Sequence, residues 1–138
     1  MTCVLDASAA SSVIFRRGEY NSIIDLLSEA ELIIAPDLYF SEMLSVIWKT
    51  LRWTDDDSVG AGELCRRAFS LLHDSVPVIH YWQRVIDLST RENHSPYDMA
   101  YAVLAERSNG TLLTLDRKLA RISGILGIPV RIWGSPSA

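Results

Sequence analysis

Short apolar runs alternate along this chain with longer segments of helical periodicity, and this alternation constrains the fold more than any other feature. Each run is about five residues long, too short for a stable helix but typical of a buried strand. The predicted strands span residues 2–6, 31–35, 76–80, 111–115 and 128–132. Strands that are apolar on both faces belong to parallel sheets covered by helices on both sides. The pattern therefore predicts an α/β fold, a three-layer sandwich around a five-stranded parallel sheet.

The segments between these runs carry apolar residues at the three- and four-residue spacing of helices that pack one face against a core. Asn109-Gly110 is a helix stop signal. With 138 residues and no internal repeat or linker, the chain is predicted to form one domain over residues 1–133, followed by a short tail at 134–138. Predicted helices cover residues 7–15, 20–30, 40–53, 81–91, 95–108 and 117–123, and one more follows an acidic cluster at 55–57 and ends near residue 73.

Other features bear on where the protein resides. No apolar run approaches the ~20 residues of a membrane-spanning helix, and the N-terminus lacks the basic segment of a signal peptide. Cys3 and Cys65 show neither CxxC spacing nor a neighbouring histidine, so we expect buried free thiols rather than a zinc site or a disulfide. Together these features predict a cytoplasmic protein with no membrane partner.

Four acidic residues fall where a predicted strand ends or the next helix begins. Asp6 and Asp116 end two strands, while Glu42 and Asp98 are expected in the first turns of helices. Because the carboxyl ends of parallel strands meet at the edge where such sheets bind ligands, we expect the four side chains to lie together. Carboxylates gathered without matching cations repel one another, and a hard ion such as Mg²⁺ or Mn²⁺ relieves that repulsion. The four acids therefore predict a metal site.

Each of these acids, taken alone, also has a simpler structural explanation. Asp6 and Asp116 would serve as N-caps of the following helices. The segment from Ser95 to Asp98 has the form of a capping box with Asp in place of Glu, and Glu42 would sit where a helix dipole favours an acid. For any single position the structural explanation is the more common one. Only the convergence of all four at one edge favours the metal site.

The same four positions carry a resemblance to a known family. Val4-Leu-Asp-Ala-Ser8 resembles the first motif of PIN domains, in particular of the VapC toxins, and Pro36 followed by Ser41-Glu42 resembles the second. Ser95-Pro-Tyr-Asp-Met-Ala-Tyr-Ala-Val-Leu-Ala105 and Thr114-Leu-Asp-Arg-Lys-Leu119 resemble the third and fourth. Any one motif is weak, but the ordered set is specific and spans nearly the whole chain. In departure from the family, Met99 stands where a small residue is usual, and basic residues follow Asp116 where some relatives have a further acid.

The resemblance implies a PIN domain with its strands in the order 3-2-1-4-5 and a metal-dependent endoribonuclease activity. It implies the toxin of a VapBC toxin–antitoxin pair, with RNA as substrate, a VapB-like antitoxin as partner and a homodimeric assembly. Glu42 would serve as ligand or as general base. By motif position, the implied catalytic residues and ligands of Mg²⁺ or Mn²⁺ are Asp6, Glu42, Asp98 and Asp116, with Ser8 and Thr114 as secondary polar groups at the rim.

The net charge of −4 argues at first against nucleic-acid binding, which depends on Lys and Arg. The four acids account for all of that charge, and the rest of the chain is formally neutral. Nearly all the cations are arginines, which suit bidentate contacts to phosphate. Arg117 and Lys118 are the favoured RNA contacts because they directly follow Asp116. An ordinary solvated helix face explains the two residues equally well.

Alternative functions remain open on the sequence alone. A housekeeping RNA-processing PIN nuclease and a non-catalytic PIN binding module both keep the predicted fold. A phosphoacceptor receiver domain also has five strands and an acidic pocket, but it needs paired acids after the first strand and a lysine after the fifth. Here Asp6 stands alone, and no lysine follows Ile132. A nucleotide-binding Rossmann domain is disfavoured because no glycine-rich loop follows the first strand.

Overall fold

The computed structural model describes residues 1–54 and 59–133 of the chain. The predicted tail at 134–138 lies outside the described residues, and so do residues 55–58, which include the acidic cluster at 55–57.

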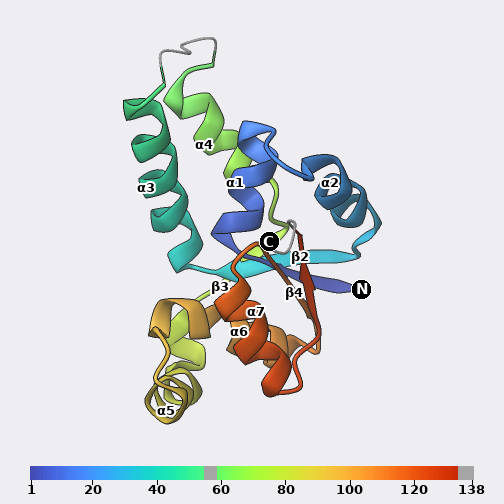
Figure 1. Cartoon of the computed structure of the whole chain (residues 1–138), viewed down its shortest axis with the longest axis vertical. Helices are drawn as coiled ribbons and strands as arrows, with labels where there is room; N and C mark the ends of the chain where they lie inside the picture. Colours follow the sequence, from blue (N-terminus) through green and yellow to red (C-terminus); the bar gives the residue numbers. More distant parts are fainter. Residues whose placement is uncertain (55–58, 134–138) are drawn as a thin grey trace, which may run out of the picture.

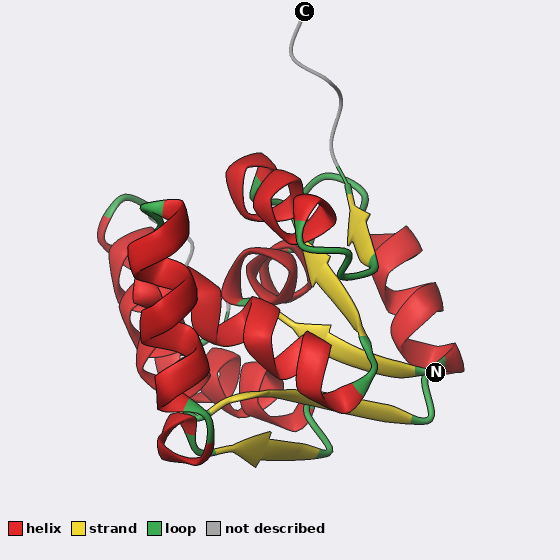
Figure 2. Cartoon of the chain, turned by 90° about the horizontal axis from the view of Figure 1, so that it is seen from below, coloured by secondary structure: helices red, strands yellow, loops and turns green. Residues whose placement is uncertain are grey.

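Five parallel strands form one sheet in the order β3-β2-β1-β4-β5, which confirms the predicted topology. Figure 2 shows the strands fanning across the sheet, the twist that L-amino acids impose on neighbouring strands. β1 lies at the centre, and its residues Cys3, Val4 and Leu5 are fully buried. The strands are β1 (Thr2–Leu5), β2 (Leu32–Pro36), β3 (Asp74–Val76), β4 (Thr111–Thr114) and β5 (Val130–Ile132).

Seven α-helices cover the sheet within the described ranges, and Figure 1 shows them in two groups, one on each face. One group consists of α1 (Ala7–Phe15), α2 (Tyr20–Glu29), α3 (Leu38–Arg52) and α4 (Ala61–Ser70). The other consists of α5 (Trp82–Glu92), α6 (Pro96–Ser108) and α7 (Arg117–Ile125).

Helix α6 packs directly on the centre of the sheet. Its residues from Met99 to Ala105 are all buried, because the sheet, α5 and α7 surround it. This burial explains why α6 shows little of the amphipathic periodicity that the outer helices have. No helix in the described ranges is both long and apolar enough to cross a membrane.

The third strand differs from its prediction at residues 76–80. It lies instead at Asp74–Val76, and Val78–His80 forms a 3₁₀ helix. Pro77 has no N–H group and therefore cannot continue the ladder of hydrogen bonds with β2. The first N–H of the 3₁₀ helix donates instead to the carboxylate of Asp37 at 3.1 Å. The chain thus leaves the edge of the sheet earlier than its apolar run suggested.

Helix α3 begins at Leu38, two residues before its predicted start, so Glu42 lies in the second helical turn and not in the first. The early start buries Tyr39 completely, and its hydroxyl donates to the Ala68 carbonyl oxygen of α4 at 2.7 Å. The helix dipole acts mainly on the first turn. It therefore does not explain an acid at position 42. Apart from the third strand and the end of α4, the predicted boundaries differ from the structure by no more than two residues.

The turn from α6 into β4 requires glycine at position 110. A Cβ atom on Gly110 would lie 2.9 Å from the Thr2 carbonyl oxygen, closer than packed atoms allow. We expect Gly110→Ala to lower the free energy of unfolding by about 1–3 kcal/mol, measured by urea denaturation, because β1 and the turn would have to move apart. Gly124→Ala in α7 is the matched control, since its Cβ would meet nothing within 4 Å. Alanine also has a higher helix propensity than glycine. Equal stability of the two variants would contradict this packing argument.

Candidate functional site

The register of the sheet places Asp6 beside Thr114. Leu5 pairs with Leu113 across β1 and β4, and the Asp6 N–H donates to the Leu113 carbonyl oxygen at 3.1 Å. Asp6 and Thr114 are the next residues along these two strands, at the carboxyl edge of the sheet. The strand order reverses between β1 and β4, with β2 and β3 to one side and β5 to the other. Parallel α/β sheets bind their ligands at such a reversal.

Three donors hold the carboxylate of Asp6, a residue that is only 5% exposed. Oδ1 accepts from the Ser8 hydroxyl at 2.7 Å and from the Ala9 N–H at 2.9 Å. Oδ2 accepts from the hydroxyl of Thr114. An ionised carboxylate offers about four acceptor positions, so the remaining capacity of Asp6 lies on Oδ2. Asp6 therefore caps α1 as expected from its position, but it is also held by two hydroxyls that helix capping does not need.

The two hydroxyls also accept hydrogen bonds from the backbone that follows β4. Ser8 Oγ accepts from the Leu115 N–H at 2.9 Å, and Thr114 Oγ1 accepts from the Asp116 N–H at 2.9 Å. Each hydroxyl thus donates to Asp6 while satisfying a backbone group at the end of β4. Ser8 and Thr114, the expected secondary polar groups, therefore hold the Asp6 carboxylate and also the backbone from Leu115 to Asp116.

Burial raises the pKa of Asp6 to about 6, despite the opposing effect of its three hydrogen bonds, and the negative charge of Asp116 raises it further. Within residues 1–54 and 59–133, neither Asp6 nor Glu42 forms an ion pair with Lys or Arg. A buried carboxylate with no neighbouring cation is costly to ionise. A positive charge bound at this edge of the sheet would remove that cost.

Glu42 is half-buried on α3, and its Oε1 accepts from the Tyr101 hydroxyl of α6 at 2.8 Å. Burial raises the pKa of Glu42, and the charges of Asp6 and Asp98 raise it further, while the bond from Tyr101 lowers it. Because Asp6 and Asp98 both affect the Glu42 pKa, each of these two acids lies within electrostatic range of Glu42.

Asp98 lies in the first turn of α6, as expected. The Ser95 hydroxyl caps this helix by accepting from the Tyr97 N–H at 3.2 Å. The reciprocal bond of a capping box is not among those found in the described residues. The Asp98 carboxylate instead has its Oδ2 3.1 Å from Nε2 of His94, whose side chain is 4% exposed. The capping-box explanation of Asp98 is therefore wrong, and the carboxylate has a buried imidazole as its partner.

Asp116 caps α7, since its Oδ1 accepts from the N–H groups of Lys118 and Leu119 at 2.9 and 3.1 Å. Arg117 and Lys118, the expected RNA contacts, are exposed in the first turn of the same helix. The capping explanation therefore holds for Asp116. Capping also fixes the direction in which this carboxylate points, so it is compatible with a second role.

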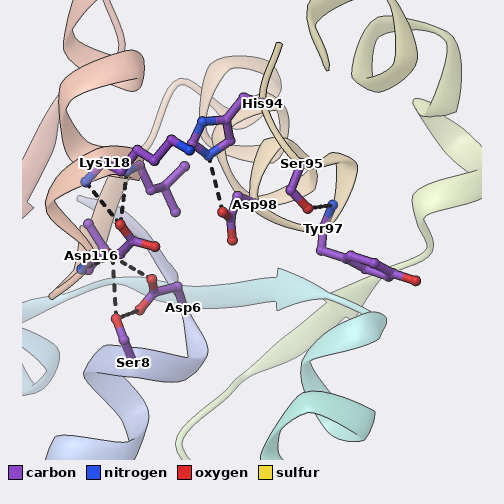
Figure 3. A network of polar contacts seen from close by, with 10 residues as sticks. Asp6, Ser8, His94, Ser95, Tyr97, Asp98, Asp116 and Lys118 are labelled. Carbon is purple, nitrogen blue, oxygen red and sulfur yellow. Dashed lines mark hydrogen bonds and ion pairs between the residues drawn. The ribbon is translucent and has the colours of Figure 1, made fainter. Parts of the chain in front are cut away.

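The structure gathers the four acids loosely. Figure 3 shows the carboxylates of Asp6, Asp98 and Asp116 turned toward a common space at the sheet edge. Among the described residues, however, no three Asp, Glu, His or Cys side chains are grouped closely enough to form a ready-made metal site.

Two residues at this edge were missed by the analysis of the sequence, His94 and Tyr101. Tyr101 stands three residues after Asp98, a spacing that puts two side chains on one helix face, but its partner Glu42 lies 59 residues away in the sequence. His94 stands four residues before Asp98 and outside the helix. The sequence shows only that His94 and Tyr101 are spaced four and three residues from Asp98. The contact of Tyr101 with Glu42 depends on the tertiary fold.

Comparison with protein families bears directly on this arrangement. The PIN domain family matches residues 3–125 of the chain. The chain belongs to the PIN-domain family. Ribonuclease VapC9 of Mycobacterium tuberculosis is 33% identical over 121 residues, which are 85% of this PIN-domain chain and 87% of the relative. Ribonuclease VapC3 of Pyrobaculum aerophilum is 29% identical over 127 residues, 87% of this chain and 93% of the relative.

Solved structures agree with this assignment at the level of the fold. PAE2754 from Pyrobaculum aerophilum superposes on the PIN domain with a TM-score of 0.68 at 23% identity, covering 88% of this chain and 87% of the other. VapBC2 from Rickettsia felis, bound to a DNA fragment from its promoter, gives a TM-score of 0.70 at 15% identity, covering 97% of this chain and 100% of the other.

The raised pKa of Asp6 makes a prediction about stability without metal. The folded pKa is about 6, whereas an unfolded Asp titrates near ~4. The folded protein then keeps a proton that the unfolded chain has released, so stability falls as the pH rises from about 4 to about 6 and stays lower above that range. Asp6→Asn cannot titrate there, and in EDTA at pH 8 we expect it to be more stable than wild type by about 3 kcal/mol.

Urea unfolding in EDTA between pH 4 and pH 8 measures this difference. Asp25→Asn is the control, because Asp25 is exposed on α2 and its loss should leave the pH dependence of wild type intact. If Asp6→Asn and Asp25→Asn gave parallel curves of stability against pH, the carboxylate of Asp6 would not be the group that titrates.

Proposed function

We propose that this PIN domain is an endoribonuclease that hydrolyses RNA phosphodiester bonds with Mg²⁺ or Mn²⁺, and that it is the toxin of a VapBC-type toxin–antitoxin pair. The single observation that carries the chemistry is the buried Asp6 carboxylate. It lies at the reversal of strand order, with three hydrogen-bond donors and, among the described residues, no Lys or Arg partner. The relatives named as VapC ribonucleases carry the proposal from a metal site to the cleavage of RNA.

The side chains at the edge fit a hard divalent cation. Every proposed ligand is a carboxylate oxygen, from Asp6, Glu42, Asp98 and Asp116, and such a donor set suits Mg²⁺ or Mn²⁺ better than zinc. Burial is the main cause of the raised pKa values of Asp6 and Glu42, and the negative charges of neighbouring carboxylates raise both values further. A bound divalent ion would balance these negative charges, stabilise charge on the phosphate and favour the ionised form of the attacking water.

The residues of the chain would keep the carboxylates in place while this chemistry proceeds. Ser8 and Thr114 hold Asp6, and the α7 backbone holds Asp116. Groups held in advance lose little conformational freedom when the substrate binds, which is where much of the catalytic effect of such sites arises. Arg117 and Lys118 would contact the RNA backbone beside the acids, since both are exposed in the turn that follows Asp116.

The two alternative PIN functions differ in what they require of the site. A non-catalytic binding module has no need of hydroxyl groups that hold a buried acid, so the contacts of Ser8 and Thr114 with Asp6 favour an enzyme. A housekeeping nuclease would share the site and lack the antitoxin. The antitoxin partner and the cytoplasmic location remain predictions. The homodimer is also a prediction, and it would bury Leu44, Trp48, Trp82 and Ile86, which are exposed on α3 and α5.

Cleavage of RNA by an Asp98 variant tests the proposed activity. Asp98→Asn keeps the size of a partly exposed side chain but removes its charge. We expect a loss of about 10²–10³-fold in cleavage rate of a pool of transfer and ribosomal RNA in Mg²⁺ or Mn²⁺, the effect of removing one group that stabilises charge in a transition state. EDTA should abolish cleavage by wild type, and Asp25→Asn should cleave as wild type does. Cleavage by Asp98→Asn at the wild-type rate would contradict the proposal.

The role of Lys118 can be tested by binding alone. In the inactive Asp98→Asn background, Lys118→Ala should weaken RNA binding for all sequences alike and reduce the slope of log affinity against log salt by about one. Lys49→Ala is the control, because Lys49 is also exposed but lies two turns beyond Glu42 along α3. An unchanged salt dependence in the Lys118 variant would mean that this lysine does not contact phosphate.

A further inference from the structure

A hydrogen bond between Tyr101 and Glu42 joins the two helical layers at the acidic edge. The Tyr101 hydroxyl, on α6, donates to Oε1 of Glu42, on α3, at 2.8 Å. The two helices cover opposite faces of the sheet (Figure 1), so the bond crosses the carboxyl edge next to β1 and β2. A tyrosine is protonated at neutral pH, and its hydroxyl is therefore a donor to a carboxylate there.

The core holds the Tyr101 ring in place. The side chain is only 2% exposed and belongs to the run of buried residues along the centre of α6. Tyr101 also lies one turn after Asp98, on the same side of the helix. One rigid helix thus presents an acid to the edge of the sheet and, a turn later, a hydroxyl that reaches the acid of another helix.

Glu42 needs such a partner more than the other acids do. Its side chain has three rotatable bonds, and the charges of Asp6 and Asp98 both act against it. Within the described ranges, the Tyr101 hydroxyl is the one hydrogen-bond donor found on the Glu42 carboxylate. Without this donor, side-chain entropy and repulsion from the neighbouring acids would both favour rotation of Glu42 toward solvent.

We propose that Tyr101 is a positioning residue of the metal centre, whose hydroxyl holds Oε1 of Glu42 and so keeps Oε2 available to the divalent cation. This inference rests on the metal-dependent function proposed above. In this role the Tyr101 hydroxyl holds Glu42 in place at the edge of the sheet, as the hydroxyls of Ser8 and Thr114 hold Asp6. Outer groups that orient a metal ligand typically change metal affinity or activity by about 10–100-fold when they are removed.

Tyr39 provides a matched control within the same core. It is also fully buried, and its hydroxyl also makes one hydrogen bond, at 2.7 Å, but to the Ala68 carbonyl oxygen and not to an acid. Tyr39→Phe and Tyr101→Phe each remove one buried hydroxyl and keep the ring. A purely structural role of Tyr101 would therefore give the two variants the same phenotype.

The experiment measures Mn²⁺ affinity of the whole chain by electron paramagnetic resonance of the free ion, beside urea stability and cleavage kinetics. We expect Tyr101→Phe to weaken Mn²⁺ binding by about tenfold and to lower kcat more than it changes KM. Tyr39→Phe should lose a comparable amount of stability and bind Mn²⁺ as wild type does. In a Glu42→Ala background, Tyr101→Phe should cause no further loss of Mn²⁺ affinity, because the partner through which it acts is gone.

Two results would overturn the inference while leaving the metal centre intact. One is Mn²⁺ affinity of Tyr101→Phe equal to that of Tyr39→Phe. The other is an equal loss of affinity from Tyr101→Phe with and without Glu42, which would mean that Tyr101 acts on another group. If wild type itself showed no saturable Mn²⁺ binding, the proposed metal-dependent function would fail, and the positioning role would fail with it.

Discussion

The candidate site of this PIN domain depends on a carboxylate that is buried at the end of its central strand. Asp6 follows β1 directly, so the sheet fixes its backbone, and the register with β4 fixes Thr114 as its neighbour. Burial raises the pKa of Asp6, and Ser8 and Thr114 hold it without neutralising it. A charge in such a place costs stability unless a cation is bound nearby. The structure tolerates this cost at the edge where parallel sheets bind ligands, which is why we assign the edge a function.

Structural and functional explanations of the acids turn out to be compatible. Asp6 and Asp116 both cap helices, and this fixes the directions of their carboxylates. Glu42 and Asp98 have no capping role in the described structure, and each is held by a single side chain, Tyr101 or His94. The candidate site thus draws on both helical layers. Backbone N–H groups hold Asp6 and Asp116, two hydroxyls also hold Asp6, and one buried aromatic side chain contacts each of the other two acids.

Much of this arrangement was predictable because it depends on local patterns. Apolar runs gave the strands, and acids at their ends gave the candidate site, since both follow from how parallel sheets are built. The third strand was misplaced because Pro77 ends the ladder inside an apolar run. The contact between Tyr101 and Glu42 was not predictable, because it joins helices that are distant in the sequence. How closely the carboxylates approach one another is set by the tertiary fold, which the sequence pattern does not specify.

Anomalous diffraction from crystals grown with Mn²⁺ tests the central claim most directly. The claim is that a divalent cation balances the buried charge of Asp6. It predicts a manganese peak at ligand distance from Oδ2 of Asp6, the oxygen with an acceptor position left among the described contacts, and from at least one oxygen of Glu42, Asp98 or Asp116. Crystals that show no manganese at this edge, at concentrations that support RNA cleavage, would contradict the claim.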